Sequence, residues 1–248
     1  MNILVCASLV PDTSAKIGVA DDGKKINPQG VKFILNPYDE FAIEEGLQLK
    51  EKHGGTVTTI TVGTPASKEV LQRALAMGSD AAVLINDPHY SDSFVVASSI
   101  AEYAKELSPD IIIFGKQSID FDSFAVPGMV AQLLELPNVS IVSTLTIDGT
   151  TVTAECDIEG GKEKVTCSLP CIVSAQKGLN DPRYPKLPDI MKAKSKPITE
   201  RAVSSVQSRT ETVSMTLPDL KRLNKIYSDS DADIAELVRL LHEEAKVI

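Results

Sequence analysis

The chain contains no tryptophan, and only 4% of its 248 residues are aromatic. Proteins that bind single-stranded nucleic acid use aromatic rings to stack on bases, and the net charge of −9 would repel a polyphosphate. No apolar run approaches the roughly 18 residues of a membrane-spanning helix, and Met1–Cys6 does not begin a targeting peptide. We therefore expect a cytoplasmic protein that does not bind nucleic acid.

Motifs for metal binding and catalysis are also missing. Four cysteines and three histidines are scattered along the chain, and Cys167-x-x-x-Cys171 has no second pair to complete a zinc site. Neither G-x-G-x-x-G after the first predicted strand nor a Walker loop occurs, and no spacing suggests a Ser-His-Asp or Cys-His arrangement. The sequence predicts buried free thiols, no metal site and no catalytic side chains.

What is present is an alternation of short apolar runs with longer segments of helical periodicity. The predicted strands are Asn2–Ser8, Thr56–Val62, Ala81–Ile85 and Asp110–Phe114. They are almost continuously apolar, as strands covered on both faces must be. The predicted helices are Pro37–Lys52, a helix from Thr64-Pro65 to Gly78, and Asp92–Leu107. This pattern predicts an α/β fold with a doubly wound, mostly parallel, Rossmann-like sheet of the kind that binds adenine nucleotides.

The pattern changes after Leu136. Further short strands are predicted at Ile141–Ile147, Thr150–Cys156, Lys164–Leu169 and Cys171–Ala175, and they would extend the sheet at an edge or form a ribbon on it. Four prolines in the segment from Gly178 to Pro197 inclusive predict an extended, partly exposed loop. We therefore expect a domain over residues 1–197, followed by an extension over 198–248. A terminal helix follows Asp229–Asp233, and the extension should lie on its own domain or on another chain.

Ligands of open parallel sheets bind beyond the carboxyl ends of the strands, where helix N-termini present unpaired N–H groups. Four segments fit that position: Cys6–Ser8, Asn36–Asp39, Val62-Gly63 and Gly115–Met129. Together they could enclose an adenine nucleotide. Asn36-Pro37 is equally explained as a simple helix cap, and the aspartates at 120 and 122 as turn residues.

A second candidate site is the segment from Arg183 to Lys196. Basic residues surround the apolar Leu187, Ile190 and Met191; they are Arg183, Lys186, Lys192, Lys194 and Lys196. Such a segment is either a solvated charged face or a docking element for a partner that has a hydrophobic pocket with an acidic border.

Several motifs, in order along the chain, resemble the electron transfer flavoprotein β subunit. They are Asn-Pro-Tyr-Asp-Glu-Phe-Ala-Ile-Glu-Glu at 36–45, Ala-Leu-Ala-Met-Gly-Ser-Asp at 74–80, Gly-Lys-Gln-Ser-Ile-Asp at 115–120, Glu-Gly-Gly at 159–161, and Asp-Pro-Arg-Tyr-Pro-Lys-Leu-Pro-Asp-Ile-Met-Lys-Ala-Lys at 181–194. Each motif alone is weak, but the ordered series is specific.

The resemblance implies a heterodimer in which an α subunit holds most of an FAD and the β chain covers part of it. Such a pair carries electrons from flavin dehydrogenases, such as acyl-CoA dehydrogenases, to a membrane quinone reductase. The β chain would bury AMP as a structural ligand, and its C-terminal extension would embrace the α subunit. Its role would be binding and orientation rather than catalysis.

The resemblance also implies the site residues. The nucleotide contacts of the family correspond here to Cys6, Asn36, Pro37, Tyr38, Asp39, Val62, Gly115, Lys116, Gln117, Ser118, Ile119, Asp120, Phe121, Asp122, Ser123, Phe124, Ala125 and Val126. The docking contacts correspond to Tyr184, Leu187, Pro188, Ile190, Met191 and Lys192, with Leu187 at the position of the leucine anchor.

One turn departs from the family pattern. Typical carriers continue after the Asp-x-Asp turn with Asn-Gln-Thr-Gly-Gln and flavin-bifurcating members with Thr-Ala-Gln-Val-Gly-Pro, whereas this chain has Ser123-Phe124-Ala125-Val126-Pro127. A phosphate here would depend on backbone N–H groups and Ser123, and the next helix should start between Ser123 and Pro127. The alternatives are a second FAD in this chain, an empty pocket, or a stand-alone nucleotide-binding protein of the universal-stress type. An adenylating ligase is disfavoured because its Ser-Gly-Gly-x-Asp-Ser turn is absent.

Overall fold

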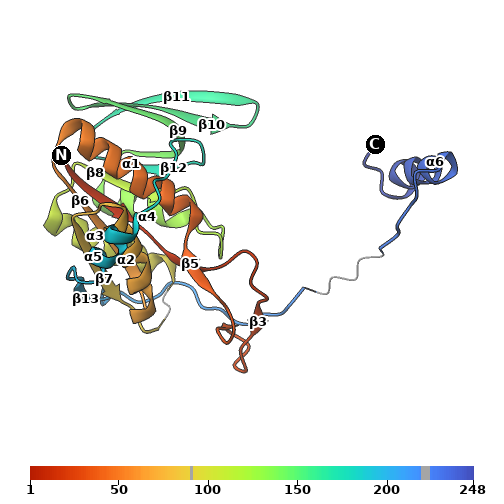
Figure 1. Ribbon diagram of the computed structural model, residues 1–248, viewed down its shortest axis with the longest axis horizontal. Coiled ribbons are helices and arrows are strands. Elements are labelled where there is room, and N and C mark those ends of the chain that lie inside the picture. The colour runs from red at the N-terminus through yellow and green to blue at the C-terminus, as the bar shows by residue number, and fades with distance from the viewer. Residues whose placement is uncertain (90–91, 219–223) are drawn as a thin grey trace.

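The computed structural model describes residues 1–89, 92–218 and 224–248. Within these residues the main sheet has nine strands in the order β11-β10-β9-β12-β8-β1-β6-β7-β13, with helices on both faces (Figure 1). The parallel strands are β1 (Asn2–Cys6), β6 (Thr56–Gly63), β7 (Ala81–Asn86), β8 (Ile111–Gly115), β12 (Cys171–Ala175) and β13 (Thr199–Ala202). The predicted doubly wound α/β fold is confirmed.

The first predicted strand is two residues too long. β1 ends at Cys6 because the backbone then leaves the ladder: the N–H of Ser8 donates to the Asp39 carboxylate, and its carbonyl accepts from the N–H of Asn36. The chain continues into two small antiparallel pairs that precede the first helix. These pairs are β2 (Leu9–Pro11) with β5 (Phe33–Leu35) and β3 (Gly18–Val19) with β4 (Ile26–Asn27).

Helices cover both faces of the sheet and enclose two main apolar clusters. One face is covered by α1 (Pro37–His53) and by α2 (Lys68–Met77), which follows the 3₁₀ turn η1 (Pro65–Ser67). The other face is covered by α3 (Ser93–Leu107) and α4 (Ala125–Leu134). The predicted end of the second helix is confirmed, since Gly78 follows α2. The third helix begins one residue later than predicted, because Asp92 is its N-cap and its carboxylate accepts from the N–H of Val95 at 3.1 Å.

Beyond α4 the chain extends the main sheet at one edge, which is the first of the two predicted arrangements. β9 (Asn138–Asp148), β10 (Thr151–Ile158) and β11 (Gly161–Ser168) are antiparallel neighbours at one edge of the sheet, and they project from the body in Figure 1. The fourth predicted strand of this region is not part of this antiparallel group. β12 is parallel to both β8 and β9 and lies between them, fully buried, as expected of a short run that is apolar on both faces.

The prediction of an extended loop between Gly178 and Pro197 is wrong in its centre, because α5 (Leu187–Ala193) is helical. Pro188 lies in the first turn, where a missing N–H breaks no helical hydrogen bond. At the other end of α5, the side chain of Ala193 is only 2% exposed and packs with Leu71 and Leu75 of α2. Pro188 therefore marks the start of a short helix.

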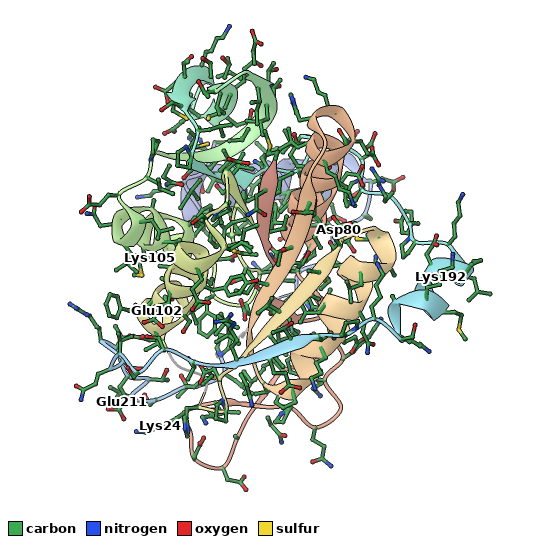
Figure 2. The ribbon with its side chains drawn as sticks, turned by 90° about the vertical axis from the view of Figure 1, so that its left-hand side faces the viewer. Lys24, Asp80, Glu102, Lys105, Lys192 and Glu211 are labelled. Atoms are coloured by element: carbon green, nitrogen blue, oxygen red, sulfur yellow. The ribbon has the colours of Figure 1, made fainter. Side chains whose placement is uncertain are left out.

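The first part of the predicted extension lies on its own domain. β13 pairs with β7 at the edge of the main sheet. The following segment crosses the start of α3, where the Asp92 carboxylate accepts from the N–H groups of Arg209 and Thr210 at 2.6 and 2.8 Å. Further on, Glu211 pairs with Lys24 at 2.7 Å, and the two side chains meet in Figure 2.

The predicted terminal helix is confirmed as α6 (Asp231–Arg239), which continues into the π-helical turn η2 (Leu240–Glu244). Residues 219–223 of the predicted extension lie outside the described residues. In the described structure no residue of α6 is buried, and the helix lies apart from the sheet in Figure 1. Across the described ranges 1–89, 92–218 and 224–248, no helix has the length and apolar character needed to cross a membrane.

Candidate functional site

The carboxyl ends of β1 and β8 are joined to the start of α1 by one buried carboxylate. Asp39 lies in the first turn of α1 and is 4% exposed. Its Oδ2 accepts from the N–H of Ser8 at 2.7 Å, and its Oδ1 accepts from the N–H of Gly115 at 3.1 Å. The structure thus brings together three of the four segments that the sequence assigned to a ligand site.

Asn36 has a different role from the simple helix cap that its position suggests. Within the described structure its side chain makes no capping hydrogen bond. Instead, Nδ2 donates to the carbonyl of Gln117 at 2.9 Å, and Oδ1 accepts from the N–H of Ile119 at 3.3 Å. Asn36 is fully buried and therefore fixes the loop after β8 against the start of α1.

Gly115 permits this close approach. A Cβ atom at this position would lie 2.7 Å from the Tyr38 carbonyl carbon and 2.8 Å from Tyr38 Cβ, and it would also collide with the Asp39 carboxylate. The sequence predicted a close backbone approach here, and the structure shows that α1 itself approaches. Glycine is therefore required by the packing of α1 on β8, whether or not a ligand is bound.

The loop between Gly115 and α4 carries polar and aromatic side chains, and its residues from Asp120 to Phe124 are exposed. Asp122 and Phe124 have positive φ angles of 49° and 55°, and the Gln117 amide donates to the Asp122 carboxylate. Lys116 Nζ lies 4.9 Å from the centroid of the Tyr38 ring. Phe121 is 77% exposed, so aromatic surface faces solvent beside the only lysine of the loop.

The start of α4 at Ala125 confirms the predicted boundary between Ser123 and Pro127. Phe124 occupies the N-cap and, among the described residues, makes no side-chain capping bond. Phenylalanine has no oxygen with which to accept from the first-turn N–H groups. The N–H groups of Ala125 and Val126 therefore receive no hydrogen bond from the N-cap side chain, and an anion next to Ser123 could accept from them.

Cys6 and Val62 occupy the predicted edge but contribute little polar surface. The Cys6 side chain is 6% exposed and lies in the cluster under α3 and α4, and Val62 packs against the same cluster. Burial, and secondarily the charge of Asp39, raises the pKa of the Cys6 thiol well above its ordinary value. A ligand would contact the backbone at these positions rather than a reactive side chain.

Two polar residues near this edge were not among the predicted site residues. Thr61 of β6 and Asn86, the last residue of β7, each have a buried side-chain oxygen with no hydrogen-bond partner in the part of the chain that the structure describes. An unpaired buried polar atom costs about 1–3 kcal/mol. The available sequence signals were the high threonine content of β6 and the polar residue that ends β7.

Burial raises the pKa of Asp39 to about 7, although its hydrogen bonds act in the opposite direction. Below about pH 4 the carboxyl is neutral in both the folded and the unfolded chain. Between that pH and 7 only the folded chain holds the proton, so this group's contribution to the free energy of unfolding falls as the pH rises. Between pH 4 and 8, we expect the free energy of unfolding of the wild type to fall by on the order of 3 kcal/mol more than that of Asp39→Asn. Urea unfolding at a series of pH values tests this, and parallel pH profiles for the two proteins would refute it.

The predicted docking residues form an exposed surface on and before α5. Tyr184, Leu187 and Met191 are 86%, 73% and 61% exposed. Lys192 projects from α5 into solvent at the edge of the molecule (Figure 2), and Pro188 is also exposed. Ile190 points partly inward, over a pocket of about 210 Å³ that α5 forms with α2 and whose lining includes Val70 and Arg73.

An open, mostly parallel sheet with a polar carboxyl edge and helices on both faces is the architecture of α/β nucleotide-binding proteins. Comparison with known proteins is more specific. The family model described as electron transfer flavoprotein domain matches residues 24–206. A Bacillus subtilis (strain 168) protein named electron transfer flavoprotein subunit beta is 43% identical over 259 aligned residues, covering 100% of both chains.

Two other relatives carry similar names. The electron transfer flavoprotein subunit beta of Syntrophomonas wolfei subsp. wolfei is 34% identical, covering 100% of this chain and 98% of its own. The mitochondrial subunit beta of Oryza sativa subsp. japonica is 36% identical over 100% of both chains. The chain therefore belongs to the electron transfer flavoprotein β subunit family, as its motifs predicted.

Proposed function

We propose that this chain pairs with an electron transfer flavoprotein α subunit, covers part of an FAD held mainly by that subunit, and binds AMP at the carboxyl ends of β1, β6 and β8. The main support is the junction at which Asn36 and Asp39 fix the loop after β8 against α1. This junction holds most of the residues that the family resemblance assigned to the nucleotide.

The residues at this edge fit a nucleotide monophosphate. The first-turn N–H groups of α4 and the Ser123 hydroxyl can donate to a phosphate, and Lys116 supplies positive charge close by. A neutral Asp39 would reduce repulsion between this edge and the phosphate. AMP would act structurally here, because none of these contacts activates a bond for reaction.

The FAD, when bound, would supply the redox chemistry. Electrons would pass from a flavin dehydrogenase of the acyl-CoA dehydrogenase type to a membrane quinone reductase. The side chains of this chain would bind and orient nucleotide and partners, without forming a covalent bond to a reacting group.

Counting the bound small molecules tests the proposal. The chain should be co-expressed with its α partner, and the purified complex denatured and extracted. One FAD and one AMP per heterodimer is the expected result. Two FAD per heterodimer would instead assign the chain to the flavin-bifurcating branch of the family. Absence of AMP would refute the nucleotide assignment. A stable homodimer that binds ATP and no flavoprotein partner would refute the proposed function as a whole.

Leu187→Ala is expected to weaken reduction of the complex by its dehydrogenase while leaving the FAD content unchanged. Truncation of an interface anchor typically costs about 2 kcal/mol or more, which corresponds to a KM about 30-fold higher. Steady-state kinetics with an acyl-CoA dehydrogenase, varying the concentration of the heterodimer, measures this. Unchanged kinetics would remove the docking assignment.

A further inference from the structure

Arg183 precedes the exposed docking residues, and its charge is directed toward the protein, unlike that of Lys192, which projects into solvent (Figure 2). Its Nε and Nη2 donate to the two carboxylate oxygens of Glu44 at 2.8 and 2.9 Å. Its Nη1 donates to Glu51 Oε1 at 2.6 Å, and its backbone N–H donates to Glu44 Oε2 at 3.1 Å. These contacts therefore attach the Arg183 guanidinium to α1, although 35% of the side chain is exposed.

The carboxylate that Arg183 binds is buried. The Glu44 side chain is 4% exposed, and an ionised carboxylate in such a position needs a charged, hydrogen-bonded partner. Although burial acts to raise the pKa of Glu44, hydrogen bonds from Arg183 and Gln48 hold it below its ordinary value. The planar guanidinium meets both oxygens at once, which fixes its orientation as well as its position.

A second residue reinforces this attachment. Asn180 Nδ2 donates to Glu45 Oε2 at 2.9 Å and to the carbonyl of Phe41 at 3.1 Å. Both Glu45 and Phe41 lie on α1, so the segment before α5 is fastened to one helix at two positions. Side chains on a rigid helix hold an attached segment more accurately than loop contacts do.

The far end of α5 is attached to different elements. Ala193 is buried against α2, and Lys196 Nζ donates to the carbonyl of Ser79 at 3.2 Å. Between the two attachments lie the exposed Tyr184, Leu187 and Met191. A partner that binds an already ordered surface avoids the entropy cost of ordering it.

We propose that Arg183 is a positioning residue that holds the segment Tyr184–Lys192 in the arrangement its redox partner binds. This inference rests on the proposed docking function. Arg183 acts through Glu44 and Glu51, and contacts neither the partner nor the flavin.

The test uses the intact heterodimer as the substrate of an acyl-CoA dehydrogenase supplied with its acyl-CoA. Arg183→Ala should raise the KM for the heterodimer about 10-fold with kcat within about 2-fold, because a mispositioned surface lowers encounter affinity rather than the chemistry. Arg183→Lys retains the charge but not the contact with both carboxylate oxygens, so its KM should lie between those of the wild type and Arg183→Ala. FAD content and reduction by dithionite, which needs no docking, should match the wild type.

Arg201→Ala is the matched control. Arg201 lies on β13, pairs with Glu106 at 2.7 Å and has a side chain 43% exposed, against 35% for Arg183. Its removal should leave KM unchanged. If Arg183→Ala does not fold, Glu51→Gln provides a milder variant, because Glu51 is 59% exposed and the Glu44 contacts remain.

A double-mutant cycle separates positioning from a general loss of stability. If Arg183 positions Leu187, then Leu187→Ala should raise KM less in the Arg183→Ala background than in the wild type. Strictly additive effects, or an equal effect of Arg201→Ala, would overturn the inference. So would a KM unchanged in the Arg183 and Glu51 variants while Leu187→Ala raises it. If Leu187→Ala does not change the KM, the docking proposal is refuted, and this inference, which depends on it, is refuted as well.

Discussion

Gly115→Ala is expected to destabilise the protein by about 3 kcal/mol or more and to lower its nucleotide content. The added Cβ would lie well inside contact distance of Tyr38 backbone and side-chain carbon atoms. These atoms belong to the first turn of α1, which Asp39 ties to β1 and β8, so the clash cannot be relieved by rotating one side chain. Relief requires α1 to move away from the sheet, which would break the junction proposed to hold the nucleotide.

Gly128→Ala is the matched control for this prediction. A Cβ at residue 128, within α4, would meet no atom of the described residues within 4 Å. Alanine also favours a helix over glycine by up to about 1 kcal/mol, so this variant should be as stable as the wild type or slightly more stable. Urea unfolding of both variants, with extraction of bound nucleotide, gives the comparison. Equal stability of the two variants would show that α1 is not held at Gly115 as described.

Leu237→Asp is expected to lower the affinity for the α subunit by about 100-fold or more, because it places a charge in a surface that the partner would desolvate. Ile234, Leu237 and Val238 lie at helical spacing on α6 and are 50%, 41% and 51% exposed. A helix of 9 residues with no packing partner is unstable in water. We propose that the α subunit covers this apolar stripe, because the family resemblance implies that the C-terminal extension embraces that subunit.

The same substitution should not affect the isolated chain. Since no residue of α6 is buried in the described structure, Leu237→Asp should leave the urea midpoint of the chain alone unchanged. Glu236→Gln, on the same helix, is the control for binding. Titration of the α subunit by calorimetry, compared across the three proteins, measures the affinities. An unchanged affinity for Leu237→Asp would show that α6 is not an α-subunit contact.

The parallel core was predictable because its signals are local. Continuous apolar runs mark strands that are buried on both faces, and Gly78 and Asp92 mark helix ends through their own backbone or side chain. The same reasoning failed at α5, since proline interrupts a helix everywhere except in its first turn. It also missed β13, whose four residues are all exposed and whose strand structure comes from pairing with β7.

The candidate site was predictable in its location and less so in the roles of its residues. Strand ends in a parallel sheet must meet at one edge, so Asn36, Asp39 and Gly115 could be grouped before any contact was known. The actual partners are long-range: the Asn36 amide binds a loop 81 residues away, and Arg183 binds Glu44 across 139 residues. Residue type alone suggested a helix cap for the first and a solvated charge for the second.

The sequence by itself determined the fold class, the order of the core elements and the family, and it predicted the edge at which a ligand would bind. These follow from periodicity, from backbone rules for glycine and proline, and from motifs that each occupy a short stretch of chain. Tertiary structure alone decided that Asn36 fixes a loop, that Asp39 is buried with a raised pKa, and that Arg183 is directed inward. These properties depend on burial and on partners distant in sequence, and the free energy of a polar or charged group is set by those surroundings.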